Sequence, residues 1–354
     1  MARCKAIKNL FPFFFLFFLA SAISAKEYLD VTPYYEVKFP EDFFYRKDYR
    51  IQWWYFTGHL FDEKGREFGY ELTFFVLGVQ KSQYESKFGV NNIYISHFAV
   101  SDVKEKKFYF TDNVDSGAYD FAGSEDNQLK TWVGKNELRG TAERMHVTAS
   151  DKNMAIDLVL IPAKPAVLNG EKGYSRKSGE SPYIASIYFS YSHLKTEGKL
   201  RIGNKVFRMK GKSWFDREIS SGELGKGQIG WDWFAIQLAD NREILLYILR
   251  NKDGSFNPYS SGTFIHKDGK YRHLLAKDFK ITILDYYRSE KTGARYPSKW
   301  EIKIPSEDLS LRITPFFSDQ EFLGTYSTGN YYWEGTCKVE GDVTGRAYVE
   351  MTGY

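Results

Sequence analysis

The segment 213–218, with the sequence SWFDRE, combines two carboxylic acids with a tryptophan. Side chains two residues apart lie on the same face of an extended strand, so Trp214, Asp216 and Glu218 are expected to point the same way. Arg217 is then expected to point the opposite way. If the Trp214 face points into a barrel and lines an aromatic pocket, desolvation raises the pKa of both carboxyls. A carboxylic acid that is still protonated near neutral pH can donate a proton to a substrate.

The segment 230–234, GWDWF, repeats this combination. Alternation puts Trp231 and Trp233 on one face of a strand and Asp232 on the other. Because indole faces attract cations, acids among tryptophans are suited to protonating an alkene and to letting water capture the carbocation. The candidate catalytic residues are Asp216, Glu218 and Asp232.

A ligand pocket around these acids needs aromatic walls, which predicts a set of ligand-binding residues. They are Trp54, His97, Trp214, Trp231 and Trp233. A structural role fits the same residues. Large aromatic side chains dominate core burial, and the DRE segment at 216–218 could form a solvated turn whose charges pair with one another. Two further acids in aromatic strands, Glu334 and Glu350, are expected to bond a barrel backbone or to pair with an arginine.

The chain that must position these residues has the pattern of an all-β protein. Runs rich in Tyr, Phe, Ile, Val and Thr alternate with turn signals roughly every 8–15 residues, as a sandwich or barrel requires. A long irregular stretch, 162–182, predicts a functional loop or lid. The Gly-rich segment 220–230 predicts a connection between two halves, so we place a domain boundary near residue 218.

The first 25 residues have the features of a secretory signal peptide. Basic residues precede the apolar run LFPFFFLFFL, and small residues follow it, with cleavage expected after Ala22 or Ala25. The run is too short to span a bilayer, which needs about 20 residues. We therefore expect an exported protein, periplasmic or secreted, with no transmembrane segment after cleavage.

Composition excludes several function classes. The net charge of +4 includes three basic residues of the leader, so little basicity remains, and we expect no nucleic-acid partner. Cleavage leaves Cys337 as the sole cysteine, and the six histidines lack metal-ligand spacing. Phosphate-binding and dinucleotide-binding glycine patterns are also absent. The sequence therefore predicts neither a metal nor a cofactor.

Several blocks of the sequence, in their order, resemble the AttH-like family, which includes carotenoid 1,2-hydratase (hydroxyneurosporene synthase). The resemblance extends from about Gln52 to Tyr354. Its main blocks are QWWYFTGHL (52–60), SHFAVSD (96–102), KSWFDRE (212–218), GWDWFAIQL (230–238), YYWEGTCKVEG (331–341) and GRAYVEMTGY (345–354). It implies two packed lipocalin-like antiparallel β-barrel domains, at 26–218 and 219–354. Such barrels have room for one small ligand.

The resemblance also implies chemistry. The family includes enzymes that add water to an isoprenoid double bond of acyclic carotenoids, and exported members described as predicted secreted hydrolases or transporter-associated proteins. In the hydratase, Asp216 would donate the proton, and Trp214 and Trp231 would line the cation site. The remaining acids, Glu218 and Asp232, would be the candidates for activating water.

One residue departs from the family pattern, which commonly has a histidine between the Asp and the Glu. Here Arg217 occupies that position. Arginine cannot shuttle protons, and it would lower the pKa of a close carboxylate unless it faces away, as strand alternation predicts.

Three hypotheses therefore stay open. The first is an exported lipocalin-like protein that binds an apolar ligand, a lipid or an isoprenoid, in a barrel cavity, with a membrane transporter as partner. The second is a hydratase or hydrolase that uses Asp216 and Glu218. The third is a surface polysaccharide-binding or structural β protein whose tryptophans lie on an open face.

Overall fold

The computed structural model describes residues 28–79, 89–222 and 224–354, so the predicted signal peptide lies outside the described residues. Regular structure within these ranges consists of β-strands and short 3-10 turns, which confirms the all-β prediction. Among the described residues, no helix has the length and apolarity needed to cross a membrane.

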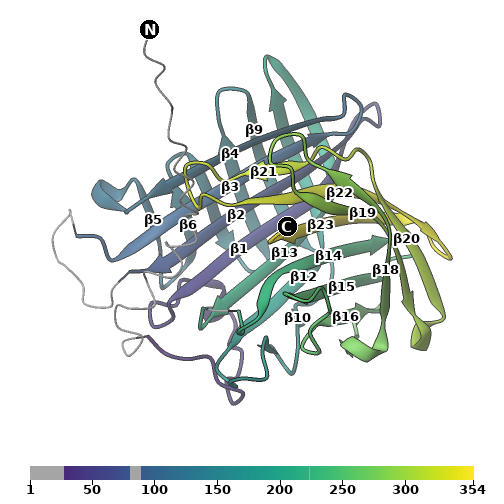
Figure 1. Cartoon of the computed structure of the whole chain (residues 1–354). Helices are drawn as coiled ribbons and strands as arrows, with labels where there is room; N and C mark the ends of the chain where they lie inside the picture. The colour runs from purple at the N-terminus through teal and green to yellow at the C-terminus, as the bar shows by residue number, and fades with distance from the viewer. Residues whose placement is uncertain (1–27, 80–88, 223) are drawn as a thin grey trace, which may run out of the picture.

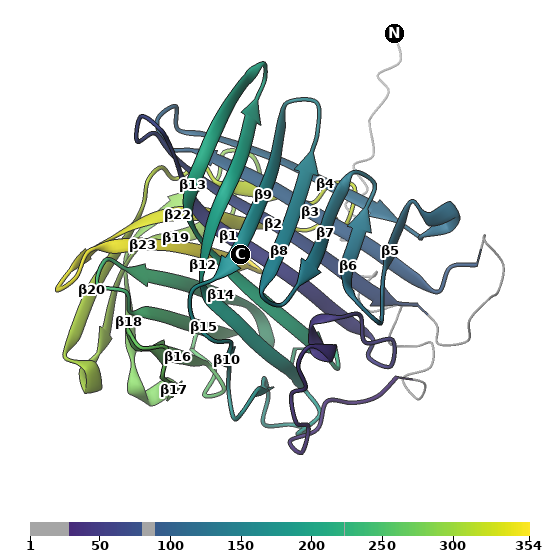
Figure 2. The same ribbon diagram turned by 180° about the vertical axis from the view of Figure 1, so that it is seen from behind.

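The first sheet has 13 strands and forms a nearly closed barrel (Figures 1 and 2). Its order is β4-β3-β2-β1-β13-β12-β9-β8-β7-β6-β5, and β10 and β11 pair with β12. Strand β6, near one end of this order, contacts β2, β3 and β4 at the other end, which brings the two edges together. The strands are β1 (Ile51–Asp62), β2 (Glu67–Gly78), β3 (Asn92–Asp102), β4 (Lys107–Asp115), β5 (Ala122–Ser124), β6 (Leu129–Val133), β7 (Asn136–Thr141), β8 (Arg144–Ser150), β9 (Met154–Pro162), β10 (Val167–Leu168), β11 (Tyr174–Arg176), β12 (Ala185–Ile202) and β13 (Lys205–Ser220).

The second sheet has ten strands and curls into a half-barrel, drawn in green to yellow in Figure 1. Its order is β17-β16-β15-β14-β23-β22-β20-β19-β18, and β21 pairs with β22. Among the described residues, the strand pairings in both sheets are antiparallel, as expected for barrels of this kind. The strands are β14 (Gln228–Leu238), β15 (Glu243–Asn251), β16 (Ser261–Ile265), β17 (Tyr271–Leu275), β18 (Lys280–Arg288), β19 (Arg295–Ile304), β20 (Leu309–Pro315), β21 (Glu321–Leu323), β22 (Tyr331–Gly341) and β23 (Gly345–Thr352).

The chain passes from one sheet to the other between Ser220, where β13 ends, and Gln228, where β14 begins. The expected division at 218 falls two residues inside β13. The irregular stretch 162–182 contributes β10 and β11, which both pair with β12. Two short parts of its backbone are therefore anchored to the first sheet.

Each sheet has its own apolar core. Phe56 and Phe215 belong to the cluster inside the first barrel, and Phe234 and Trp300 to the cluster inside the second. These clusters are continuous because the strands alternate and every second side chain points inward. The inward faces supply the apolar side chains that close each barrel.

A third apolar cluster lies between the two barrels. Strands β1 and β2 lie against β22 and β23, and β12 lies against β14 and β15. Tyr55, Tyr188 and Trp214 of the first sheet pack there with Trp233 and Tyr247 of the second. The expectation that the Trp214 face lines the inside of a barrel is therefore wrong. Both faces of β13 are buried from Ser213 to Ser220, so alternation defined two faces but not which one points inward.

Candidate active site between the two barrels

Asp216 lies on the face of β13 that meets the second domain, and only 3% of its surface is exposed. Its carboxylate accepts hydrogen bonds from three uncharged donors: the Tyr188 hydroxyl (2.6 Å), the Ser190 hydroxyl (2.5 Å) and the Trp214 indole N–H (2.7 Å). Desolvation raises the pKa of Asp216 to about 7, although the three donors act in the opposite direction. Near neutral pH the group therefore exists in both protonation states, so it can donate a proton and take one back.

Register explains why these partners meet. Asp216 is paired with Tyr55 of β1 on one side and with Ser190 of β12 on the other. Trp214 lies two residues away on the same face of β13, which puts its indole N–H within reach of the carboxylate. We call Asp216, Tyr188, Ser190 and Trp214 the Asp216 site.

Glu218 shares this face but has a cationic partner. Its Oε1 lies 2.9 Å from the Nζ of Lys177 and accepts a hydrogen bond from Ser186. Lys177 is 8% exposed and lies over the rings of Tyr188 and Tyr247, at 5.3 and 4.2 Å from their centroids. The stretch 162–182 thus supplies a lysine to the site, which the sequence did not indicate.

Asp232 does not join the other two acids. It points to the opposite face of β14, where it accepts hydrogen bonds from Arg250 (3.0 Å) and Tyr354 (2.9 Å). Burial raises the pKa of Asp232 to about 6, and the Arg250 charge opposes this rise. Within the described part of the chain, Asp216 is the member of the predicted trio that has no ion pair: Glu218 has Lys177 and Asp232 has Arg250.

The aromatic walls come from both domains. Trp233 donates its indole N–H to the Tyr188 hydroxyl at 3.0 Å. The ring of Trp233 meets those of Trp214 and Tyr55 edge to face, with centroids 6.3 and 5.0 Å apart. Trp231, on the same face of β14, is only half-buried. The structure therefore brings Trp214 and Trp233 together beside Asp216, and Trp231 packs against the same apolar cluster, as alternation along the two strands favours.

Two of the predicted ligand-binding residues, Trp54 and His97, lie away from the Asp216 site. Trp54 points into the first barrel, where its indole N–H donates to the Phe43 carbonyl at 2.8 Å. Arg217 stacks over the Trp54 ring at 4.0 Å, on the face opposite to Asp216. Its guanidinium bonds the Gln52 side chain and several main-chain carbonyls. Trp54 is therefore a core residue, and Arg217 points away from Asp216, as strand alternation predicts.

His97 lies in the interface between the two domains, at a distance from the Asp216 site. Its ring contacts the hydroxyls of Tyr332 (2.7 Å) and Ser327 (2.9 Å) and stacks on Phe322. Desolvation lowers the pKa of His97 to about 4, against the charge of Asp112, so the ring is neutral at physiological pH. His97 fixes the position of Tyr332.

The interface holds three more acids that sequence reasoning did not assign to catalysis: Glu71, Glu334 and Glu350. The expectation that Glu334 and Glu350 bond backbone or arginine is wrong. Glu334 accepts a hydrogen bond from the Tyr55 hydroxyl (2.7 Å), and Glu350 from the Trp231 indole (2.9 Å). Desolvation raises the pKa of Glu71 and Glu334 well above the usual range, and that of Glu350 to about 7. The sequence did contain a signal for these acids, because each of them lies among aromatic residues of a predicted strand.

Five side chains that face the interface keep exposed surface, in contrast to the buried Asp216 site. They are Trp53, Phe75, Trp231, Tyr332 and Glu350. The rings of Trp53 and Phe75 lie 6.3 Å apart. We call these five residues the aromatic rim.

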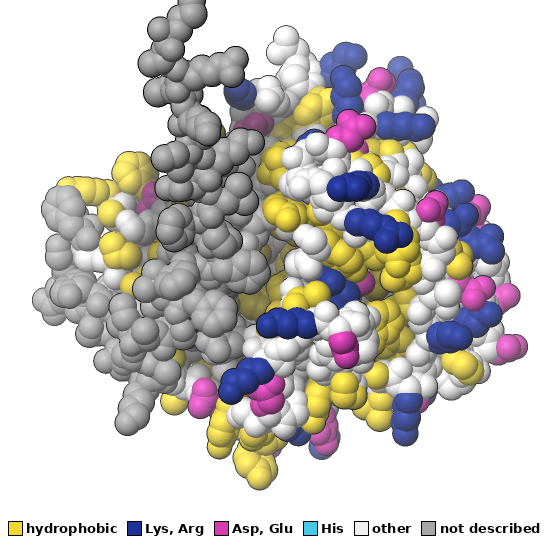
Figure 3. Space-filling view, viewed as in Figure 1, with side chains coloured by type: hydrophobic (Ala, Val, Ile, Leu, Met, Phe, Trp, Pro, Cys, Tyr) yellow, Lys and Arg dark blue, Asp and Glu magenta, His cyan; other side chains and the backbone are white. Residues whose placement is uncertain are grey.

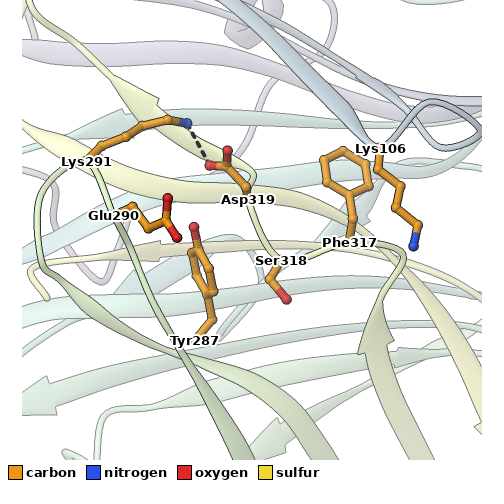
Figure 4. Close-up of a pocket in the computed structure, with 7 residues that line it drawn as sticks. All are labelled: Lys106, Tyr287, Glu290, Lys291, Phe317, Ser318 and Asp319. Atoms are coloured by element: carbon orange, nitrogen blue, oxygen red, sulfur yellow. Dashed lines mark hydrogen bonds and ion pairs between the residues drawn. The ribbon is translucent and has the colours of Figure 1, made fainter.

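A separate pocket of about 400 Å³ opens at the surface (Figure 4). Its lining mixes aromatic and charged side chains and includes the ion pair between Lys291 and Asp319, which are 2.6 Å apart. None of the acids described above lines it. Figure 3 shows basic and acidic side chains interspersed over the coloured part of one face. In the described ranges, no group of three or more His, Cys, Asp or Glu side chains could hold a metal ion.

Comparisons with known proteins agree with this architecture. A crystal structure of an AttH protein from Nitrosomonas europaea has a TM-score of 0.84 to this chain at 29% identity, and the match covers 92% of this chain and 99% of that one. Kievitone hydratase from Nectria haematococca has the same fold, with a TM-score of 0.67 at 17% identity, over 92% of this chain and 96% of that one.

In sequence, the chain is 22% identical over 270 residues to the dehydratase asqC of Emericella nidulans, which covers 73% of this chain and 74% of that protein. The sequence pattern of the AttH-like family matches residues 30–354, almost the whole described chain. The protein therefore belongs to the AttH-like family.

Proposed function

We propose that this protein is an acid–base enzyme that adds water to, or removes water from, a carbon–carbon double bond of an apolar substrate held between the two barrels. The observation that carries the proposal is the environment of Asp216. This carboxyl is buried among indoles, is held by uncharged donors and has a pKa raised to about 7. Relatives named as a hydratase and a dehydratase support this class of reaction.

The proposed hydration starts from protonated Asp216. Its proton forms a C–H bond at one alkene carbon and leaves a cation at the other. The indole faces of Trp214 and Trp233 stabilise that cation. Water then attacks the cation, and the proton that water loses returns to the Asp216 carboxylate, so the enzyme ends in its starting state. Dehydration follows the same steps in reverse.

The neighbours of Asp216 hold it in a usable orientation. Tyr188 donates to Asp216 and accepts from Trp233, so its hydroxyl ties the acid of one domain to the wall of the other. Glu218, two residues further along the same face, is the group best placed to orient the attacking water. Its partner Lys177 balances its charge beside the substrate.

A second candidate function is carriage of a lipid or isoprenoid ligand without turnover. The half-buried rings of the aromatic rim favour it, since apolar pockets with few polar groups are ordinary ligand sites. The ligand would then lie between the barrels, because apolar side chains occupy the barrel interiors. A polysaccharide platform is not proposed, because Trp214 and Trp233 are 2% and 5% exposed and form no open face.

We also propose that the protein is exported and that a membrane transporter is a partner. The signal-peptide pattern of residues 1–25 supports export. The transporter is suggested by the transporter-associated members of the family that the chain resembles. Mass spectrometry of the protein recovered from its host tests the first part. A mature chain that begins after Ala22 or Ala25 is expected, and an intact Met1 in a cytoplasmic fraction would contradict export.

The experiment on catalysis uses Asp216→Asn. The wild-type protein is incubated in H₂¹⁸O with a panel of acyclic terpenoids, and mass spectrometry detects incorporation of the heavy oxygen. We expect the variant to lose turnover by at least about a hundredfold, the size of a general acid contribution. The matched control is Asp30→Asn, because Asp30 is exposed. Equal activity of Asp216→Asn and wild type would rule out the proposed role. Retention of a terpenoid without turnover would favour the carrier.

A further inference from the structure

Three buried polar groups in the interface have hydrogen-bonding capacity that the fold does not use. Glu71 of β2, Glu334 of β22 and Tyr348 of β23 are 0%, 0% and 1% exposed. Within the described part of the chain, one oxygen of each has no hydrogen-bond partner: Oε2 of Glu71, Oε2 of Glu334 and the hydroxyl of Tyr348. We call these three residues the oxygen subsite.

The three groups face the same space from two domains. Glu71 comes from the first sheet, whereas Glu334 and Tyr348 come from the second. Tyr348 is paired with Thr336 of β22, two residues from Glu334 on the same face, and β2, which carries Glu71, lies against β22. The charges of both acids accordingly help to raise the pKa of Tyr348, after desolvation. The other oxygens of the acids are occupied, because Thr73 donates to Glu71 and Tyr55 to Glu334. The unused oxygens are therefore the ones left to meet a further group.

Leaving these atoms without partners would be costly. A buried donor or acceptor that lacks its hydrogen bond costs about 1–3 kcal/mol, and here three such groups lie together. Within the described residues, neither acid takes part in an ion pair. Native proteins rarely leave such groups unpaired. This arrangement therefore points to a partner that is not part of the chain.

The chemistry of the group limits what that partner can be. Burial raises the pKa of both acids well above the usual range and so favours their protonated forms, in which each offers an O–H, as Tyr348 does. Neutral donors of this kind suit a carbonyl or hydroxyl oxygen, as a protonated acid beside a tyrosine does in some known active sites. A carboxylate or phosphate would instead place a negative charge among acids, and among the described residues no cation forms an ion pair with Glu71 or Glu334.

We propose that Glu71, Glu334 and Tyr348 bind an uncharged oxygen, a carbonyl or a hydroxyl, of an otherwise apolar substrate. This inference rests on the proposed function and adds the substrate class: an oxygenated apolar molecule rather than a pure hydrocarbon or a fatty acid anion. Tyr55 of β1 connects the oxygen subsite with the Asp216 site. It is paired with Asp216 of β13, and its hydroxyl donates a hydrogen bond to Glu334. A substrate anchored by its oxygen would then present a nearby carbon to Asp216.

A displacement assay tests the inference without requiring turnover. The neutral fluorophore N-phenyl-1-naphthylamine is bound to the purified full chain and displaced by 2-decanone, 2-decanol, decane or decanoate. We expect the wild type to bind the ketone and the alcohol about tenfold more tightly than decane, the size of one or two buried hydrogen bonds. Decanoate should bind most weakly. Equal binding of ketone and decane would overturn the inference and leave ordered water as the partner of these groups.

Variants assign the preference to the named residues. Glu334→Leu should abolish the preference for ketone over decane, whereas Glu334→Gln, which keeps a donor, should retain most of it. Glu340→Gln is the matched control, because Glu340 is an exposed acid on the same strand. If Glu334→Leu does not fold, Tyr348→Phe decides, and it should weaken the preference at least about threefold. An unchanged preference in the variant that folds would contradict the assignment.

The two proposals can fail independently. Asp216→Asn removes the proposed proton donor but leaves the oxygen subsite intact, so it should keep the ketone preference. Loss of turnover with a retained preference supports both. If the wild type is active but shows no preference for ketone over decane, the oxygen subsite alone is rejected. If the preference is present but Asp216→Asn does not reduce turnover, the catalytic proposal alone is rejected.

Discussion

Asp216→Asn should stabilise the folded protein at neutral and alkaline pH. The folded-state pKa of Asp216 is about 7, above its ordinary value of 3.8, with desolvation as the main cause. Between these two values the folded state holds a proton that the unfolded chain has released, so the free energy of unfolding falls as pH rises through this window. Because asparagine cannot ionise, the free energy of unfolding of the variant does not fall in this way as pH rises.

The size of the effect follows from the same numbers. One pH unit of difference between folded and unfolded pKa corresponds to about 1.4 kcal/mol, so raising the pKa from 3.8 to about 7 costs the wild type about 4 kcal/mol above neutral pH. The amide also faces the Tyr188 hydroxyl, which donates to the carboxylate in the wild type. That mismatch removes about 1 kcal/mol. We expect a net stabilisation of about 3 kcal/mol at pH 8.

Urea unfolding measured from pH 4.5 to 9 tests this prediction. The difference between variant and wild type should be small or slightly negative at the acidic end, grow up to about pH 7 and then level off. Asp30→Asn serves as the control, since an exposed carboxyl should give a difference near zero throughout. A difference that does not change with pH would refute the reasoning, because it would mean that burial does not alter the ionisation of Asp216.

Further predictions concern the neighbours of this acid. Lys177→Met should destabilise the fold by about 3 kcal/mol in urea, because it leaves Glu218 buried without its cation, and adding Glu218→Gln should recover much of the loss. Tyr188→Phe removes a donor to the Asp216 carboxylate, so the pKa should rise and the activity profile should shift to higher pH, by about one unit. Arg217→Lys should lower the free energy of unfolding by about 2–3 kcal/mol without changing that profile, because an ammonium cannot replace the planar, multiply bonded guanidinium.

The local part of the site could be predicted because strand alternation is a local property. A period of two requires Trp214 and Asp216 to share a face and Arg217 to point away, whatever the strand packs against. The same rule placed Trp231 with Trp233 and turned Asp232 to the other side. Predominantly β structure followed in the same way from the apolar runs and the turn residues between them.

What only the tertiary structure decided is which surface each face meets. Both faces of the central strands are apolar enough to be buried, so the sequence could not show that the Trp214 face meets a second barrel instead of the interior of its own. Nor could it show that Lys177 balances Glu218 while Asp216 has no cation within the described residues. Contacts between distant strands fix burial and charge pairing, and these determine a carboxyl's pKa. The chemistry of Asp216 is therefore a property of the packed domains, built on an alternation that the sequence alone specifies.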